Sequence, residues 1–188
     1  MQDIDQLLTE IAPDDPQLAE ALVHTYGAYL ERFAAAYLGD PAEADDAVQE
    51  TFIRAARSLH RYQPGSNLRA WLTAICANVC KGRRRRRKTA TRLQQSLERV
   101  RLAFADPSPE ETLLAQESQD QLRAALQALD DRHRLVVILR YLQGLPVRDI
   151  AQILEIPEGT VHSRLHHAHH QLRGALLAAG WDSEGGVQ

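Results

Sequence analysis

Residues 146–172 read PVRDIAQILEIPEGTVHSRLHHAHHQL, and this stretch decides the fold. It begins with Pro146, which suits the first position of a helix because a proline's missing N–H has no partner there. Apolar residues then recur at helical spacing in two groups, Ile150, Ala151 and Leu154, and Val161, Leu165, Ala168 and Leu172. Residues 155–158 separate the two groups, so the stretch predicts a helix-turn-helix.

The second helix of such a motif turns its outward face to the major groove of DNA. Its apolar positions fall on one narrow stripe, and the remaining positions face outward. Those outward positions are Thr160, Ser163, Arg164, His166, His167 and Gln171. Their hydrogen-bond donors suit phosphates and base edges. Periodicity alone also allows an ordinary helical hairpin with a solvated polar face.

The sequence upstream predicts further helices and no strand. Residues 17–38 carry apolar and aromatic side chains at helical spacing, and Gly39 ends the pattern. Asp40 can cap a second helix that starts with Pro41. The loop at 62–67 (YQPGSN) precedes a third amphipathic helix that runs into a block of arginines. Because no strand-like alternation occurs, the predicted fold class is all-α.

Two prolines in DPSPEE, residues 106–111, interrupt the helical pattern between the two halves of the chain. We therefore expect two small helical domains, at 1–88 and 111–178, joined by a flexible linker at 89–110. The second domain is a four-helix unit that ends in the helix-turn-helix. We expect a disordered tail at 179–188.

Charge is distributed unevenly along the chain, although the formal net charge is only -3. Residues 1–50 hold twelve Asp or Glu and a single basic residue, Arg32, whereas residues 81–92 hold eight Lys or Arg and no acid. One surface therefore suits a basic protein and another suits nucleic acid. The basic run 83–88 (RRRRRK) can gain affinity from phosphates without specifying a base sequence, or can be a solvated charge run.

Several classes of function are not supported by the sequence. No apolar run spans a bilayer, and the N-terminus is acidic where a signal peptide is basic, so we expect a cytoplasmic protein with no membrane insertion of its own. Only two cysteines occur, Cys76 and Cys80, so no disulfide framework is expected. No catalytic constellation is evident, and we expect no enzyme, cofactor or bound metal.

Three segments in this order carry a family resemblance: DDAVQETF at 45–52, WLTAICAN at 71–78 and GTVHSRLHHAHHQLR at 159–173. Together they resemble the extracytoplasmic-function group of bacterial sigma factors of the sigma-70 family, over about residues 17–177. The resemblance implies a region 2 helical bundle at 1–88 and a region 4 helix-turn-helix at 111–178. It also implies that the chain binds core RNA polymerase and directs promoter-specific transcription initiation.

The resemblance assigns roles to residues of this chain. It implies docking of the second helix on the polymerase's clamp helices through Asp46, Gln49 and Glu50, which also share one polar helical face. It implies capture of unpaired minus-10 bases by the loop and third helix, through Asn67, Arg69, Trp71, Asn78, Lys81, Arg83 and Arg84. It implies reading of the minus-35 element through Thr160, His162, Ser163, Arg164, His166 and His167. By itself, Trp71 can stack on a base or belong to the core.

Some positions depart from the family's pattern. Ala74 and Ala77 stand where relatives commonly carry basic residues, which weakens the expected grip on melted DNA. Histidines at 162, 166, 169 and 170 stand where Lys or Arg is usual, so we expect minus-35 binding to weaken as pH rises from about 6 to 8. Cys76 stands where relatives usually carry a small apolar residue.

Two alternative functions remain at this point. A transcription regulator would bind its operator through the C-terminal domain without polymerase. A metal- or redox-sensing adaptor would use the four-residue spacing of His162, His166 and His170, or of Cys76 and Cys80, although solvated histidines and buried thiols are the favoured interpretation. By resemblance we also expect an anti-sigma factor as a partner; the sequence reveals neither its identity nor the signal or target promoters.

Overall fold

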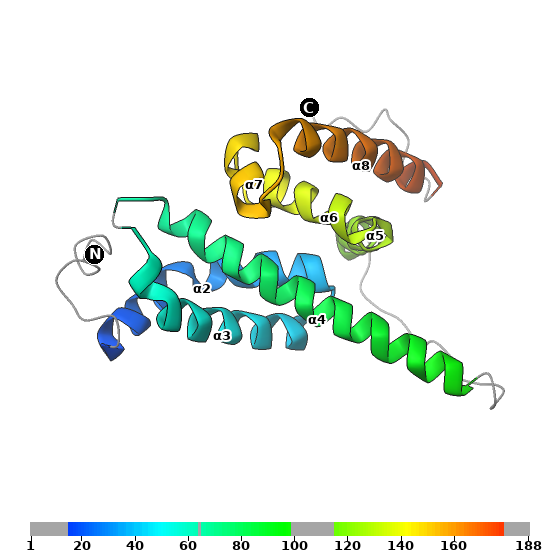
Figure 1. Cartoon of the computed structure of the whole chain (residues 1–188). Coiled ribbons are helices and arrows are strands. Elements are labelled where there is room, and N and C mark those ends of the chain that lie inside the picture. Colours follow the sequence, from blue (N-terminus) through cyan, green and yellow to red (C-terminus); the bar gives the residue numbers. More distant parts are fainter. Residues whose placement is uncertain (1–14, 64, 99–114, 179–188) are drawn as a thin grey trace.

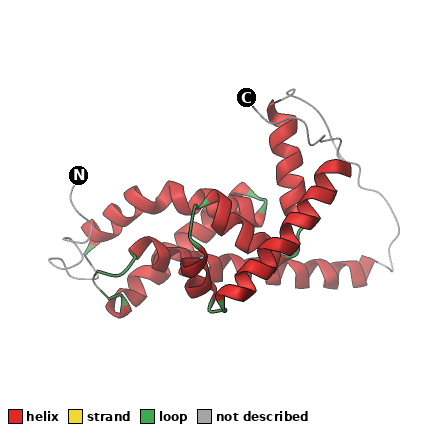
Figure 2. Cartoon of the chain, turned by 90° about the horizontal axis from the view of Figure 1, so that it is seen from above, coloured by secondary structure: helices red, strands yellow, loops and turns green. Residues whose placement is uncertain are grey.

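The structure is a computed structural model that describes residues 15–63, 65–98 and 115–178. Every regular element in these ranges is a helix, which confirms the all-α prediction. Within the described ranges, Figure 2 shows helices joined by short loops. None of the helices in the described ranges combines the length and apolar content needed to cross a bilayer. The tail at 179–188 lies outside the described residues.

The N-terminal unit packs three long helices, α2 (Pro16–Leu38), α3 (Pro41–Ser58) and α4 (Leu68–Glu98), with the short 3-10 turn η1 (Leu59–Arg61) after α3. As predicted, α2 ends at Gly39, whose φ of 79° suits a glycine, and the Asp40 carboxylate caps α3 by accepting from two backbone N–H groups. Phe33, Tyr37 and Leu72 are among the fully buried side chains that hold the three helices together.

Helix α4 runs through the block of arginines, as predicted, and on beyond it. It continues to Glu98, so the expected start of the linker at 89 falls inside this helix. Figure 1 shows its C-terminal half projecting past the other helices of the unit. The rest of the expected linker, residues 99–110, lies outside the described residues, and the domain limits stay a prediction.

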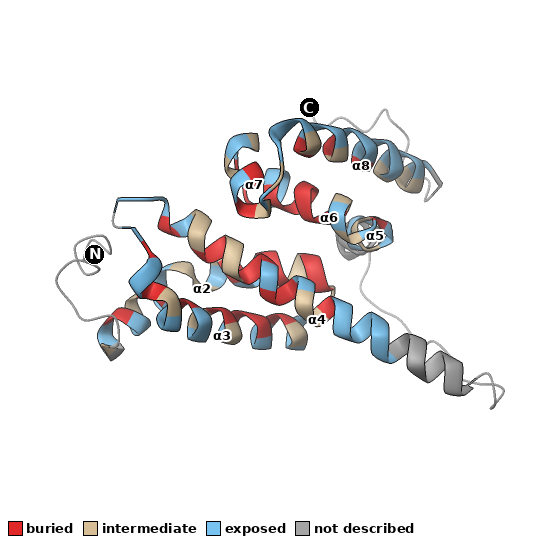
Figure 3. Ribbon diagram, in the orientation of Figure 1, coloured by how far each residue is buried: buried red, intermediate tan, exposed pale blue. Residues whose placement is uncertain are grey.

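The C-terminal unit contains α5 (Ala115–Ala128), α6 (Asp131–Val137), the π-turn η2 (Ile138–Leu142), α7 (Val147–Leu154) and α8 (Glu158–Ala178). Helices α7 and α8 form the predicted helix-turn-helix, and Glu155 ends α7 with a left-handed φ of 54°. Ile150, Val161 and Ala168 are fully buried or nearly so, as the periodicity predicted. In Figure 3 the buried residues of both units gather on the parts of the helices that lie against other helices.

The two units pack against each other, which the sequence did not indicate. The Gln127 side chain at the end of α5 donates to the Ala36 carbonyl of α2 at 3.0 Å. A second contact between the units joins Arg69 of α4 to the Gln143 carbonyl, to which it donates at 2.8 Å. Backbone carbonyls near helix ends therefore accept hydrogen bonds across the interface between the units.

Candidate functional site

The acidic face of α3 is partly neutralised from within the chain. Arg83 of α4 donates to the Glu50 carboxylate at 3.1 Å and to the Asp46 carboxylate at 3.2 Å. Glu50 also accepts from Arg54, one turn away, at 2.5 Å. Burial alone would raise the pKa of Glu50, but the hydrogen bonds from Arg83 and Arg54 outweigh it and lower the pKa overall. Asp46 nevertheless keeps 64% of its side-chain surface exposed.

The third residue predicted on this face, Gln49, is exposed as well, and its amide donates to the Asp45 carboxylate at 3.2 Å. Asp46, Gln49 and Glu50 therefore lie on one side of α3, with an outward-facing rim that stays accessible. Glu43, one turn earlier, pairs with Arg87 of α4 at 3.3 Å. The acids of α3 and the arginines of α4 thus form a ladder between two adjacent helices.

The basic run 83–88 is divided among three directions by the helical turn of α4. Arg83 and Arg87 face α3. Arg84 and Lys88 face the C-terminal unit, where both donate to Asp131 of α6, at 2.5 and 2.8 Å. Arg85 is exposed with no ion-pair partner among the described residues. Only part of the run is therefore free to meet phosphate in this arrangement.

Arg84 is the most deeply held cation of the run. It is 9% exposed and also donates to the carbonyl of Tyr37 and to the side chain of Gln127. Burial alone would raise the pKa of Asp131, but the hydrogen bonds from Lys88 and Arg84 outweigh it and lower the pKa overall. Asp131 is therefore an anionic junction between the two units.

The N-terminal part of the predicted minus-10 set has structural contacts of its own. Asn67 caps α4, because its side-chain oxygen accepts from the Ala70 N–H at 3.0 Å. Arg69 lies over the Tyr29 ring, with 4.3 Å between the guanidinium carbon and the ring centroid. Trp71 is partly buried and packs on Tyr62 with 5.4 Å between ring centroids. Trp71 therefore packs beside the loop and stays partly accessible.

The outward face of α8 is exposed as the sequence predicted. His162, Ser163, His166 and His167 are exposed, and Thr160 and Arg164 are half-buried. The ring of His167 lies 6.0 Å from that of His133 on α6, centroid to centroid, so it borders the body of the unit. The described residues contain no group of three or more side chains placed to hold a metal ion.

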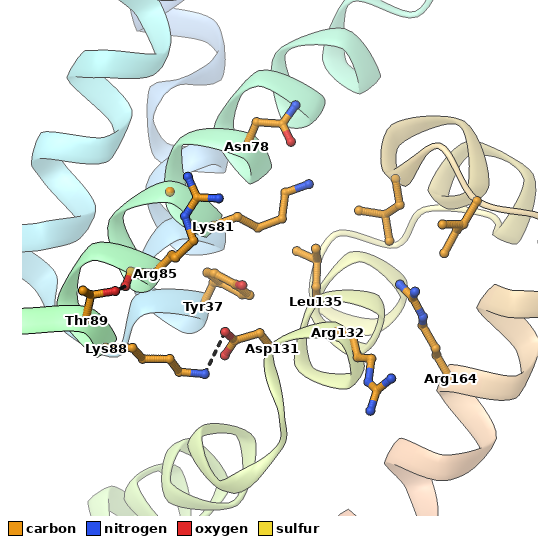
Figure 4. Close-up of a pocket in the computed structure, with 13 residues that line it drawn as sticks. Tyr37, Asn78, Lys81, Arg85, Lys88, Thr89, Asp131, Arg132, Leu135 and Arg164 are labelled. Atoms are coloured by element: carbon orange, nitrogen blue, oxygen red, sulfur yellow. Dashed lines mark hydrogen bonds and ion pairs between the residues drawn. The ribbon is translucent and has the colours of Figure 1, made fainter. Parts of the chain in front are cut away.

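A cavity of about 670 Å³ lies between α4 and the C-terminal unit. Asn78 and Lys81 of the predicted minus-10 set and Arg164 of the predicted minus-35 set all line it. Figure 4 shows Lys81 reaching from α4 and Arg164 from α8 toward this space. The structure thus brings together members of two sets that the sequence had assigned to separate surfaces.

Arg134 of α6 is a residue that the sequence reading missed. Its side chain is fully buried and donates to the carbonyls of Leu126 and Leu129 at 2.6 Å, to that of Gln127, and to that of Tyr37 in the other unit at 3.3 Å. An arginine immediately before the apolar run 135–139 was the available signal, because a charge beside a buried stripe needs partners.

Cys76 and Cys80 are both fully buried, with 4.0 Å between their sulfur atoms. The hydrogen bond between the thiols and burial both raise the pKa of Cys80, which keeps it protonated. The buried, protonated thiol of Cys80 is a poor nucleophile and a poor metal ligand, whereas the same hydrogen bond lowers the pKa of Cys76.

Comparison with known proteins agrees with this geometry. The family model of Sigma-70 region 2 matches residues 22–90, and that of Sigma-70, region 4 matches residues 119–171. The ECF RNA polymerase sigma factor EcfG of Rhodopseudomonas palustris is 34% identical over 162 residues, which are 83% of this chain and 83% of that protein. The chain belongs to the ECF sigma factors. SigE of Mycolicibacterium smegmatis is 35% identical over 159 residues, and the match spans 84% of this chain and 61% of SigE.

Two solved structures share the architecture. CnrH, in a complex with the cytosolic domain of CnrY, superposes with a TM-score of 0.66 at 25% identity, covering 94% of this chain and 99% of CnrH. The sigma factor RpoE of Bartonella quintana, in a complex with the anti-sigma factor NepR, gives a TM-score of 0.64 at 26% identity, covering 87% of this chain and 98% of RpoE.

As an ECF sigma factor, this chain is not an enzyme: it binds core RNA polymerase and promoter DNA and directs transcription initiation. The N-terminal unit is region 2 and the C-terminal unit is region 4. Family membership therefore favours the sigma factor over the two alternatives raised from the sequence, the polymerase-independent regulator and the sensing adaptor.

Proposed function

We propose that the promoter and polymerase contacts of this sigma factor are divided among three helices. Helix α3 docks on the clamp helices of core polymerase through Asp46, Gln49 and Glu50. The loop before α4 and α4 itself hold the opened minus-10 strand, through Asn67, Arg69, Trp71, Asn78, Lys81, Arg83 and Arg84. Helix α8 reads the minus-35 element in the major groove, through Thr160, His162, Ser163, Arg164, His166 and His167.

The observation that carries this proposal is the segregation of charge on neighbouring helices of one unit. The accessible rim of α3 is acidic, whereas α4 carries unpaired cations such as Lys81 and Arg85 on a different side. A basic partner and a DNA strand can therefore bind at the same time. Holding only the opened strand shifts the duplex equilibrium toward melting, because closed DNA gains none of those contacts.

The packing of the two regions bears on this proposal. Arg69 donates to the Gln143 carbonyl and Arg84 donates to the Asp131 carboxylate, and both partners belong to region 4. Neither side chain is therefore available to DNA while the regions stay packed. Release of region 4 from region 2 removes the region 4 partner of each side chain. Promoter engagement therefore includes separation of the two regions.

The partners of the solved relatives suggest a regulator for this chain. CnrH was solved with the cytosolic domain of CnrY, and RpoE with the anti-sigma factor NepR. We propose that an anti-sigma factor likewise holds this chain inactive. We also propose that this sigma factor acts in the cytoplasm, where RNA polymerase binds the chromosome.

The experiment that tests the division of labour measures polymerase binding and transcript formation separately. Asp46→Lys with Glu50→Lys is expected to abolish binding to purified core polymerase and all promoter-directed transcripts. Glu31→Lys, a matched reversal at an exposed position on α2, should leave both unchanged. Circular dichroism verifies that each variant is folded. Normal polymerase binding by the double variant would refute the docking surface.

The reversals also remove the partners of Arg83, so a compensating variant is needed. Glu50→Arg with Arg83→Glu restores an ion pair of opposite polarity between α3 and α4. Its thermal stability should exceed that of Asp46→Lys with Glu50→Lys, while binding to core polymerase stays weak. Restored polymerase binding in this variant would show that the acids act only within the fold.

A further inference from the structure

The cleft between α4 and region 4 has the size of a small-molecule site. Its volume of about 670 Å³ lies within the range of roughly 300–1,000 Å³ that is usual for ligand pockets. One wall is α4, and the other is formed by α6, the end of α7 and α8. Because both regions contribute, a ligand in this cleft would contact region 2 and region 4 together.

The walls of the cleft are strongly cationic. Five of the lining residues are basic, namely Lys81, Arg85, Lys88, Arg132 and Arg164, and only one, Asp131, is acidic. Lys88 is neutralised by Asp131 at 2.8 Å, and Arg132 by Asp130 at 3.1 Å. The remaining three, Lys81, Arg85 and Arg164, have no ion pair within the part of the chain that the structure describes.

These unpaired cations come from opposite walls. Lys81 and Arg85 belong to α4, and Arg164 belongs to α8, and Figure 4 shows them around one space. Burial lowers the pKa of Lys81, and the charge of Glu155 opposes this effect only partly. The Lys81 ammonium is therefore partly desolvated without a close carboxylate. Packing of the two regions brings the positive charges of α4 and α8 together, and an anion between them reduces their repulsion.

We propose that this cleft binds a small molecule carrying a chain of two or more phosphates, which bridges Lys81 and Arg85 of α4 to Arg164 of α8. Arginine forms paired hydrogen bonds with phosphate oxygens and lysine supplies a point charge, so the three side chains suit several linked phosphates better than one. Asn78 adds an amide donor at the rim, and Leu154 and Ile156 offer an apolar surface beside the charges.

Binding in the cleft has a consequence for promoter recognition. A bridging anion stabilises the packed arrangement of the two regions, because it binds that arrangement and not the separated one. Asn78, Lys81 and Arg164 are also proposed DNA contacts, so the ligand and promoter DNA exclude each other. The competition rests on the proposed function, whereas the binding itself does not.

Calorimetric titration of the full-length chain, without polymerase, DNA or divalent cations, tests the binding directly. The probes are inorganic tripolyphosphate, ATP and orthophosphate. Tripolyphosphate or ATP should bind with a stoichiometry of one, and orthophosphate should bind at least about tenfold more weakly. Equal affinity for ATP and tripolyphosphate identifies the phosphate chain as sufficient, and tighter binding of ATP shows that the nucleoside rests on the apolar surface; both results support the site.

Variants locate the site. Lys81→Gln and Arg164→Gln should each weaken binding at least about tenfold. Arg57→Gln, which removes an exposed cation from α3, should leave it within about twofold. The wild-type affinity should also fall steeply with added NaCl, which needs no variant.

Three results would overturn the inference. They are no binding of either polyphosphate at millimolar concentration, orthophosphate binding as tightly as tripolyphosphate, and equal loss of affinity in Arg57→Gln and the cleft variants. None of them depends on polymerase docking, so the charge-reversal experiment on α3 can fail or succeed independently.

Discussion

The guanidinium of Arg83 lies between two carboxylates of the neighbouring helix, 3.2 Å from Asp46 and 3.1 Å from Glu50. Arg83 comes from the basic run of α4, and the two acids come from the proposed polymerase-binding face of α3. This contact joins the two functional surfaces of region 2. A change at Arg83 therefore acts on the acidic face as well as on the basic one.

Replacement of Arg83 by Gln is expected to lower the free energy of unfolding by about 1 kcal/mol, because a half-buried bridge to two carboxylates is lost. Glu50 keeps its contact with Arg54, which limits the loss. Urea unfolding followed by circular dichroism measures the change.

Arg86→Gln is the matched control, since Arg86 is exposed on the same helix with no ion pair among the described residues. It should leave stability unchanged and weaken binding to single-stranded DNA. Equal stability of the Arg83 and Arg86 variants would contradict a structural role for Arg83.

Local signals in the sequence predicted the helices well, and for a physical reason. Gly39, Asp40 and Pro41 define a helix end and the next helix start through interactions within a few residues. The buried stripe of α8 depends only on helical periodicity. The all-α class, the helix-turn-helix and the exposed face of α8 therefore followed from the sequence.

The interaction partners of the arginines could not be predicted from the sequence. Whether Arg84 meets DNA or Asp131 depends on how region 4 packs against α4, a long-range contact that no local pattern encodes. Arg134 was missed because its partners are backbone carbonyls, which every residue possesses. The end of α4 could not be predicted from the pattern, because periodicity weakens where a helix leaves the core, although the backbone can continue.

Replacement of Arg134 by Met should cost about 3 kcal/mol, since it leaves several buried carbonyl oxygens without a donor. Burial and the nearby charge of Arg84 lower the pKa of Arg134 to about 10, so the side chain remains charged at neutral pH. Chemical unfolding of Arg134→Met and of Arg132→Met, whose side chain is 68% exposed, provides the comparison. A loss below 1 kcal/mol in the first variant would show that water replaces the guanidinium.

Asn67 allows its role as a helix cap to be separated from a role in DNA binding. Asn67→Ala removes the bond to the Ala70 N–H and should lower stability by about 1 kcal/mol. Asn67→Asp keeps the cap, because aspartate accepts the same bond, but places a negative charge beside the proposed path of the minus-10 strand. Thermal unfolding and transcription from a minus-10-dependent promoter are measured on both variants. We expect Asn67→Asp to unfold at the same temperature as the wild type and to lose transcripts. A lower unfolding temperature for Asn67→Asp would contradict the separation of the capping role from the DNA-binding role.

Asp131 should govern the pH dependence of the packing between the two regions. In the packed arrangement the bonds from Lys88 and Arg84 hold the pKa of Asp131 below its ordinary value of 3.8, against the opposing effect of burial. A depressed carboxyl pKa stabilises the packed arrangement above the ordinary value, and the stabilisation is lost as pH falls through the depressed one. Small-angle X-ray scattering should therefore show a constant radius of gyration between pH 7 and about 4, and an increase below that.

The Asp131→Asn variant should have the larger radius of gyration already at pH 7. Asp130→Asn is the control, because Asp130 also has a lowered pKa but bonds only within region 4, to the His133 N–H and to Arg132. If Asp131→Asn remains as compact as the control at pH 7, Asp131 is not the junction that holds the regions together.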